Sequence, residues 1–204
     1  MRQKKNRGRD LWDLTILCLL RIRPMHPYEM QRLIHEWHKD DYLDLKRGSL
    51  YHAIERLRRA GWIEALEKGR QGRRPERTVY RLTDSCAHGT LDWLCELLAK
   101  PLREPTQFFA ALSFLPHLSP DNVLDRLQER VGLLEAEVAQ LTEVLDMMVP
   151  RIGRLVLVEV EYARAMRQAE AAWVKSLMDD LRSGALHWDP ERIIACFANP
   201  PQEG

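Results

Sequence analysis

Apolar residues recur at helical spacing in the first part of the chain and predict three helices. The first helix is expected over residues 10–22, the second from Pro27 onward, and the third over residues 47–60. The first is expected to bury Leu11, Leu14, Thr15, Cys18 and Ile22. The second is expected to bury Met30, Leu33, Ile34 and Trp37. The third is expected to bury Leu50, Ile54 and Leu57, and to carry on its other faces Arg47, Ser49, His52, Glu55, Arg56, Arg58 and Arg59.

The apolar period shortens to about 2 after Gly61, which is expected to end the third helix in a left-handed conformation. Residues 62–66 and 78–82 are rich in β-branched and aromatic side chains and predict two strands. Residues 68–75, K-G-R-Q-G-R-R-P, carry four basic side chains and predict the loop of a hairpin. Thr83 is then expected to cap a helix that reaches Ala99. The apolar residues of that helix are Leu91, Leu94, Leu97 and Leu98.

The second half of the chain predicts a short helix at 106–114 and then two long ones. Ser119-Pro120-Asp121 supplies a capping hydroxyl, a first-turn proline and a carboxylate, which together favour a helix start. The apolar residues that follow are spaced alternately by three and four, and we call these eight positions the heptad seam. They are Leu124, Leu127, Val131, Leu134, Val138, Leu141, Leu145 and Met148. Pro150 and Gly153 are expected to end this helix.

A last long helix is predicted over residues 155–182, and Gly184 is expected to terminate it. Its apolar face consists of Val158, Tyr162, Met166, Ala169, Trp173 and Leu177. The heptad seam needs an apolar partner surface, which either this last helix or a second copy of the chain can supply.

The composition is that of a soluble globular protein, with 45% apolar and 30% charged residues. The apolar run Leu14–Leu20 is too short to span a bilayer and is followed by Arg21 and Arg23, so we expect a cytoplasmic protein without a membrane segment. The four cysteines are scattered without C-x-x-C spacing. We expect neither a metal site nor a cofactor.

Charge divides the chain into a basic and an acidic part. Residues 1–82 contain 20 Lys/Arg against 11 Asp/Glu, whereas residues 83–204 contain 11 against 19. The first nine residues, M-R-Q-K-K-N-R-G-R, include five basic side chains and are expected to form an arm. We therefore expect a polyanion-binding domain over residues 1–83 and a helical domain over residues 84–204.

Three helices followed by strand, basic loop and strand is the order of a winged helix-turn-helix, so the fold class is expected to be mainly α with a two-stranded wing. The major groove of DNA, about 12 Å wide, admits the third helix. Expected groove contacts are Arg47, Ser49, Tyr51 and His52. Expected phosphate or minor-groove contacts are Lys46, Arg70, Arg73 and Arg74.

Residues 14–82 resemble the PadR family of transcriptional regulators. The resemblance rests on the apolar run at 15–20, H-P-Y-E-M at 26–30, R-G-S-L-Y-x-A-I-x-R-L at 47–57, A-G-W-I-E at 60–64 and R-R-P-E-R-T-V-Y-R-L-T at 73–83. Family members usually have glycine where this chain has Cys86. The long helices resemble the larger PadR subfamily, in which C-terminal helices form the dimer. The resemblance therefore implies that the heptad seam packs both against the last long helix and against a second copy of the chain. The resemblance implies a homodimeric regulator that binds double-stranded DNA, mostly a repressor, in some cases released by small aromatic molecules.

A small aromatic effector requires a pocket, and aromatic residues of the helix after the wing and of the last helix are candidates for its walls. The candidates are Trp93, Leu94, Leu97, Tyr162, Met166 and Trp173. The competing interpretation is that these side chains pack the core and the dimer.

The sequence favours a DNA-binding regulator over two other classes of function, an enzyme and a protein-interaction module. The sequence assembles no nucleophile, base and orienting group, so no catalytic residue is assigned and an enzyme is not expected. The alternative is a winged-helix protein-interaction module that has lost DNA binding. The basic arm and the basic loop argue against that alternative, and salt-dependent DNA binding distinguishes the two.

Overall fold

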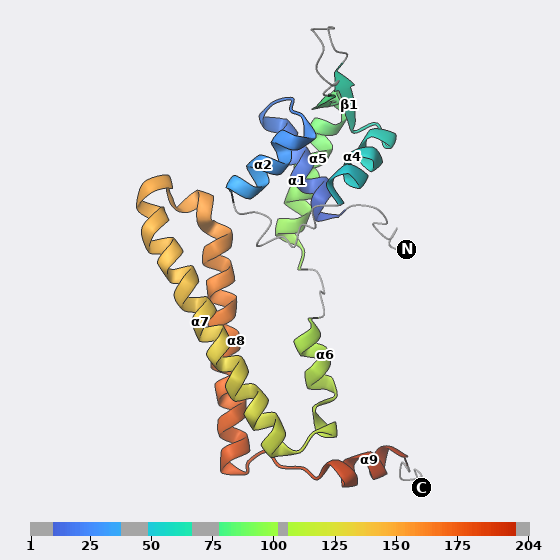
Figure 1. Cartoon of the computed structure of the whole chain (residues 1–204). Helices are drawn as coiled ribbons and strands as arrows, with labels where there is room; N and C mark the ends of the chain where they lie inside the picture. The colour runs from blue at the N-terminus through green and yellow to red at the C-terminus, as the bar shows by residue number, and fades with distance from the viewer. Residues whose placement is uncertain (1–9, 38–48, 67–77, 102–105, 199–204) are drawn as a thin grey trace. The chain divides into compact units, whose positions relative to one another are not determined.

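A computed structural model describes residues 10–37, 49–66, 78–101 and 106–198 (Figure 1). The chain divides into two compact units, Met1–Arg103 and Glu104–Gly204. Each unit has its own buried core. None of the helices in the described ranges combines the length and the apolar character needed to cross a membrane.

The first unit is a winged helix built around its first helix. Its elements are α1 (Leu11–Ile22), α2 (Pro27–Glu36), α4 (Ser49–Arg59), β1 (Ile63–Leu66), β2 (Val79–Leu82) and α5 (Asp84–Ala99). Helix α1 contacts α4, α5 and β2, and its Ile16 and Leu17 have no exposed surface. The predicted mainly helical fold with a two-stranded sheet is confirmed.

The predicted buried face of α1 is wrong. Leu11 and Ile22 are 49% and 61% exposed, and Cys18 is half-buried. The buried side chains are instead Trp12, Asp13, Ile16, Leu17, Leu19 and Leu20. The helix is apolar on most sides, and several elements pack around it, so the spacing of its apolar residues does not select one face.

The buried faces of the next two helices follow the predicted pattern closely. Met30 and Ile34 of α2 are buried, whereas Trp37 stands at the C-terminal cap and is 46% exposed. In α4 the predicted Leu50, Ile54 and Leu57 are all buried, together with Ala53. Gly61 has a φ of 72°, which confirms the left-handed conformation expected after this helix.

The two predicted strands form an antiparallel hairpin. Ile63 pairs with Leu82 and Leu66 with Val79. Residues 67–77, which join the strands and include the predicted basic loop, lie outside the described residues. The segment between α1 and α2 adds a further bridge, because the amides of Met25 and Tyr80 each donate to the carbonyl oxygen of the other, at 3.1 and 3.0 Å. The base of the wing is thereby tied to the start of the helix-turn-helix.

Helix α5 belongs to the first unit, since it packs against α1. The expected boundary at residue 83 had assigned it to the C-terminal part. Its buried side chains are Cys86, Thr90 and Trp93, whereas the predicted Leu91 and Leu98 are 43% and 81% exposed. Burial of the large indole therefore orients this helix more than its leucines do.

The second unit is a helical hairpin with shorter helices beside one end (Figure 1). Its elements are α6 (Gln107–Ser113), η1 (Leu115–His117), α7 (Pro120–Ile152), η2 (Arg154–Leu157), α8 (Val158–Ser183) and α9 (Pro190–Ala198). Ser119 caps α7 as predicted, and its hydroxyl accepts from the amide of Asn122 at 3.3 Å. Pro150 lies inside α7 and does not end it as predicted. The helix continues to Ile152, and Gly153, with a φ of 86°, forms its C-terminal cap. Helix α9 was not predicted.

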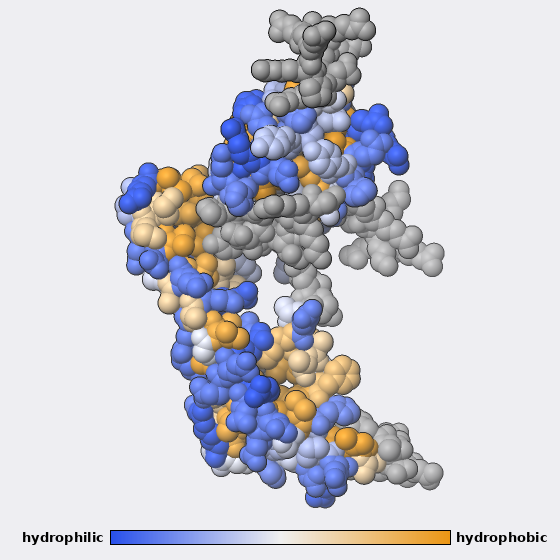
Figure 2. Space-filling view, in the orientation of Figure 1, coloured by the Kyte–Doolittle hydropathy of each residue, from blue (hydrophilic) through white to orange (hydrophobic). Residues whose placement is uncertain are grey.

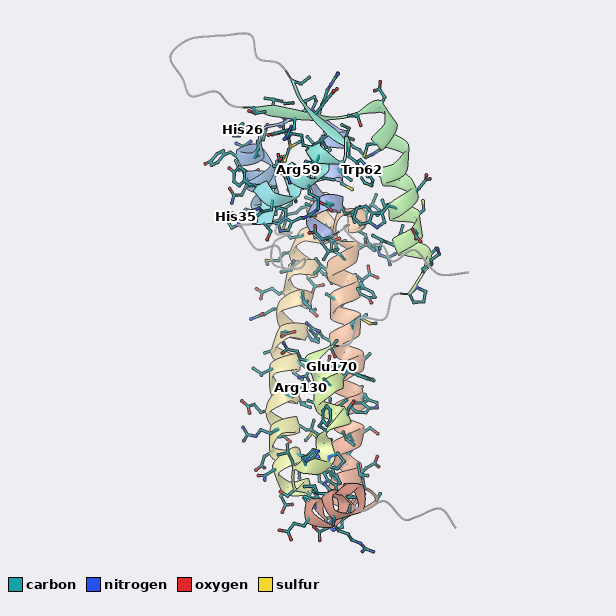
Figure 3. All side chains as sticks on the ribbon, turned by 90° about the vertical axis from the view of Figure 1, so that its right-hand side faces the viewer. His26, His35, Arg59, Trp62, Arg130 and Glu170 are labelled. Atoms are coloured by element: carbon teal, nitrogen blue, oxygen red, sulfur yellow. The ribbon has the colours of Figure 1, made fainter. Side chains whose placement is uncertain are left out.

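The heptad seam is buried against α8 of the same chain. Leu127, Val131, Leu134 and Leu145 are at most 7% exposed, and the other four seam residues are half-buried. Val174 of α8, with no exposed surface, belongs to the same cluster as Leu127 and Val131. Ion pairs follow the seam along the hairpin, and Arg130 and Glu170 face one another across it (Figure 3). Helix α8 is therefore the partner that the heptad seam requires.

The predicted apolar face of α8 is not the one it buries. Val158, Tyr162, Met166 and Trp173 are 50%, 66%, 44% and 50% exposed, and we call these four residues the outer stripe. The buried residues of α8 are Val160, Ala171, Val174 and Met178, on the opposite side of the helix. Helix α8 thus has two apolar faces, and only one of them contacts α7.

A buried and an exposed leucine of α7 give a test of the hairpin. Replacing Leu127 with Ala leaves a cavity between α7 and α8 and should lower the free energy of unfolding by about 2–5 kcal/mol. Leu133 of α7 is 62% exposed, so Leu133→Ala should change it by less than about 0.5 kcal/mol. Urea unfolding by circular dichroism, with amide exchange of α7 and α8 peptides, measures both variants. Equal losses for the two would contradict this packing.

Candidate nucleic-acid interface

Helix α4 has one face fixed in the core and one face open to solvent. Leu50, Ala53, Ile54 and Leu57 are between 0 and 3% exposed. The opposite side carries Tyr51, which is 59% exposed, and the exposed His52, Arg58 and Arg59. Such a helix can enter a groove with one face while the other holds it to the domain.

The predicted DNA contacts divide into described and undescribed residues. Tyr51 and His52 lie on the open face of α4, and Ser49 lies half-buried at the start of this helix. The other predicted contacts, Lys46, Arg47, Arg70, Arg73 and Arg74, lie outside the described residues. The structure thus places three of the predicted contacts on the first turn of α4.

Arg56 of α4 does not lie free in solvent as the sequence pattern suggested. Its Nε donates to both carboxylate oxygens of Asp13, at 3.2 and 3.1 Å, and its Nη2 donates to Asp13 Oδ1 at 2.7 Å. The same Nη2 donates to Asp10 Oδ2 at 2.6 Å. Arg56 therefore links the open helix to the N-terminus of α1.

The two aspartates form the cap of α1 as well. The amide of Asp13 donates to Asp10 Oδ1 at 3.0 Å, and the amide of Asp10 donates to Asp13 Oδ2 at 3.2 Å. The Asp13 side chain is 2% exposed. Burial raises the pKa of this carboxyl, and the hydrogen bonds from Arg56 and from the Asp10 amide act in the opposite direction. Without Arg56, Asp13 would be a buried charge with only its capping bond.

Acidic side chains moderate the basic charge on the open face. Glu55 accepts from Arg58 at 2.9 Å and from Arg59 at 2.8 Å. The hydrogen bonds from Arg58, and then those from Arg59, lower the pKa of Glu55 to about 2. Glu55 therefore remains ionised at neutral pH and holds both guanidinium groups on this side of α4.

The base of the wing is fixed to the end of α4. The Thr83 hydroxyl donates to the carbonyl oxygens of Gly61 and Trp62, at 2.9 and 3.2 Å. The amide of Trp62 donates to the carbonyl oxygen of Leu57 at 3.0 Å. These bonds hold the residue before β1 and the residue after β2 against the end of α4. Thr83 is the N-cap residue of α5 as predicted, but its hydroxyl makes no capping hydrogen bond and instead joins the wing to α4.

The predicted effector residues come from both units. Trp93 is 4% exposed within the core of the first unit, beside the half-buried Leu94 and Leu97. Tyr162, Met166 and Trp173 belong to the outer stripe of the second unit. Their meeting in one pocket stays a prediction.

A cavity that the sequence did not predict lies within the second unit. It has a volume of about 400 Å³ and lies between the end of α6, η1 and α9. Its apolar lining consists of Phe114, Pro116, Ile193 and Ile194, and Ser113 and His117 complete it. Figure 2 shows a hydrophobic surface over α6. Because α9 was not predicted, sequence reasoning had no means of finding this cavity.

Comparison with known proteins gives a family for the winged part of the chain. Residues 16–88 match the model of the transcriptional regulator PadR-like family. A search of curated protein sequences found no match.

Solved structures resemble the chain over most of its length. Bacillus subtilis PadR in complex with operator DNA aligns with a TM-score of 0.63 and 21% identity, over 83% of this chain and 98% of that one. The same protein in complex with p-coumaric acid gives 0.66 and 19%, over 83% and 98%. The Vibrio cholerae virulence activator AphA gives 0.62 and 17%, over 84% and 98%. At these identities the likeness concerns the fold.

Proposed function

We propose that this chain, which carries a PadR-like winged-helix domain, is a transcriptional regulator that recognises a specific sequence of double-stranded DNA. The observation that carries the proposal is the two-sided α4, whose buried leucines hold it in the domain while Tyr51 and His52 face solvent. The basic segment 68–75 between β1 and β2, which the sequence predicts to be the loop of the wing, is the second element such a domain needs. A similar fold has been solved with operator DNA, which supports the proposal.

In the proposed complex, α4 enters the major groove with its first turn toward the bases. Ser49, Tyr51 and His52, with Arg47 before them, make the contacts that discriminate sequences. Lys46 and the wing residues Arg70, Arg73 and Arg74 neutralise phosphates or enter the minor groove and supply affinity for any sequence. The rival function, a protein-interaction module, requires none of these contacts.

Discrimination between sequences is the direct test of α4. His52→Ala or Tyr51→Ala should lower the ratio of operator affinity to random-DNA affinity, because a good base contact contributes about 1–3 kcal/mol of discrimination. His117→Ala, which alters an exposed histidine of the second unit, should leave the ratio unchanged. Fluorescence anisotropy with both DNAs measures it. If both α4 variants keep the wild-type ratio, another face of the domain contacts the bases.

We propose that the regulator is a homodimer and that its second units form the interface. The heptad seam is already buried against α8, and Trp173 of the outer stripe contacts Phe108 of α6, so we place the second copy on Val158, Tyr162 and Met166. These three residues follow one another at a spacing of four along one side of the helix, which suits antiparallel or parallel helix packing. Two linked winged domains would gain affinity for a two-part operator through effective concentration.

Charged substitutions in the outer stripe test dimerisation without altering the buried core of the hairpin. Tyr162→Glu with Met166→Glu should place two charges in the proposed interface, release folded monomer and weaken operator binding, because one half-site is then bound alone. Gln140→Glu with Gln168→Glu adds the same charge at exposed positions away from the stripe and should remain dimeric. Sedimentation velocity at micromolar concentration measures the oligomeric state of wild type and of both variants. A monomeric wild type would contradict the proposal.

We propose further that the protein represses transcription and that a small aromatic molecule releases it from DNA. A similar protein has been solved with p-coumaric acid, which supports this class of ligand. Titration with p-coumaric acid should quench tryptophan emission and displace operator DNA. Trp173→Leu should reduce the quenching, whereas Trp37→Leu, at an exposed position of the first unit, should not. Quenching without loss of DNA would argue against an effector role.

A further inference from the structure

We propose that the Asp13–Arg56 ion pair positions the recognition helix α4, so that operator recognition depends on two residues that do not touch DNA. The proposal rests on the function proposed above. Helix α4 is joined to α1 by packing and by the directed hydrogen bonds from Nε and Nη2 of Arg56 to Asp13, which we call the fork.

The packing of Leu50, Ile54 and Leu57 restricts the rotation of α4, but the burial of apolar surface that drives this packing is non-directional. A guanidinium that donates through two nitrogens to one carboxylate has a fixed planar geometry. Arg56 makes this contact with Asp13 through Nε and Nη2. The bidentate pair therefore adds a directed constraint on the rotation of α4 to the restriction that packing imposes.

The rotation set at Arg56 is transmitted to the predicted base contacts. Arg56 and His52 are one helical turn apart, and Ser49 lies one further turn toward the N-terminus. A helix behaves as a rigid rod over this length, so a change at Arg56 rotates the residues that face the bases. Asp13 is itself held by the reciprocal capping bonds with Asp10 and offers a fixed anchor.

Charge considerations separate this proposal from its alternatives. Asp13 is an anion in a domain proposed to bind a polyanion, so its neutralisation should strengthen DNA binding if only net charge mattered. Arg56, for its part, would contribute to the salt dependence if it bound a phosphate. Its guanidinium already donates to Asp13 and Asp10, and its side chain is 38% exposed. If the pair positions α4, neutralising Asp13 should weaken operator binding. Replacing Arg56 should then leave the salt dependence of DNA binding unchanged.

The experiment compares full-length variants on operator and on random duplex over a series of salt concentrations. Asp13→Asn should weaken operator binding between about fivefold and a hundredfold, the loss expected for one misplaced base contact, and leave random-DNA binding unchanged. Arg56→Lys keeps the charge but cannot form the fork, and should give the same loss. For both, the slope of log affinity against log salt should equal that of wild type.

Two controls calibrate the measurement. Glu129→Gln removes an exposed carboxylate from α7 of the second unit without altering the fork, and should bind both DNAs as wild type does. Arg73→Ala with Arg74→Ala removes the proposed phosphate contacts and should flatten the salt slope. Stoichiometric titration gives the folded, active fraction of each protein, and binding is referred to that fraction. If Asp13→Asn does not fold, Arg56→Lys and Arg56→Met carry the test.

Three results would overturn the positioning role. Operator affinity of Asp13→Asn at or above wild type would show that only charge matters. A salt slope of Arg56→Lys reduced like that of the wing variant would make Arg56 a phosphate contact. A lowered melting temperature with an unchanged operator-to-random ratio would leave the pair a purely structural role. A wild type without preference for any DNA would overturn the proposed function first, before any variant is compared.

Discussion

Burial of α1 at the centre of the winged unit is the constraint on which the other elements depend. Ile16 and Leu17 have no exposed surface, and the helix contacts α4, α5 and β2 at once. Its capped N-terminus also carries a polar link to α4, from Asp13 and Asp10 to Arg56. The position of α4 and the base of the wing therefore both derive from the same helix. The surface proposed to bind DNA is thus held by a helix that need not contact DNA.

The sequence predicted the order and type of most elements because their patterns are local. The buried face of α4 could be predicted, since that helix has a single apolar side bounded by charged residues. The faces of α1 and α8 could not be predicted in this way. Helix α1 is apolar on most sides, and α8 has two apolar sides, of which periodicity singled out the exposed one. Spacing shows that an apolar face exists, whereas the partner of that face depends on tertiary contacts.

The candidate site shows the same distinction between local and distant information. Tyr51 and His52 were predicted correctly to lie on the open face, because their position on α4 follows from the helical repeat. Arg56 was placed with them, although it is bound to Asp13, which precedes it by 43 residues. No local pattern distinguishes an arginine that faces solvent from one that reaches a distant carboxylate. The ion pair between Arg56 and Asp13 was therefore not predicted.

The central claim is that this chain recognises a specific DNA sequence through α4. DNase footprinting on the DNA that flanks its own gene, repeated over a range of salt concentrations, tests it most directly. The account predicts protection of two related half-sites about one helical turn, roughly 34 Å, apart, with affinity that falls steeply as salt rises. Uniform protection without a preferred site, or no binding at low salt, would contradict the account and favour a protein-interaction module.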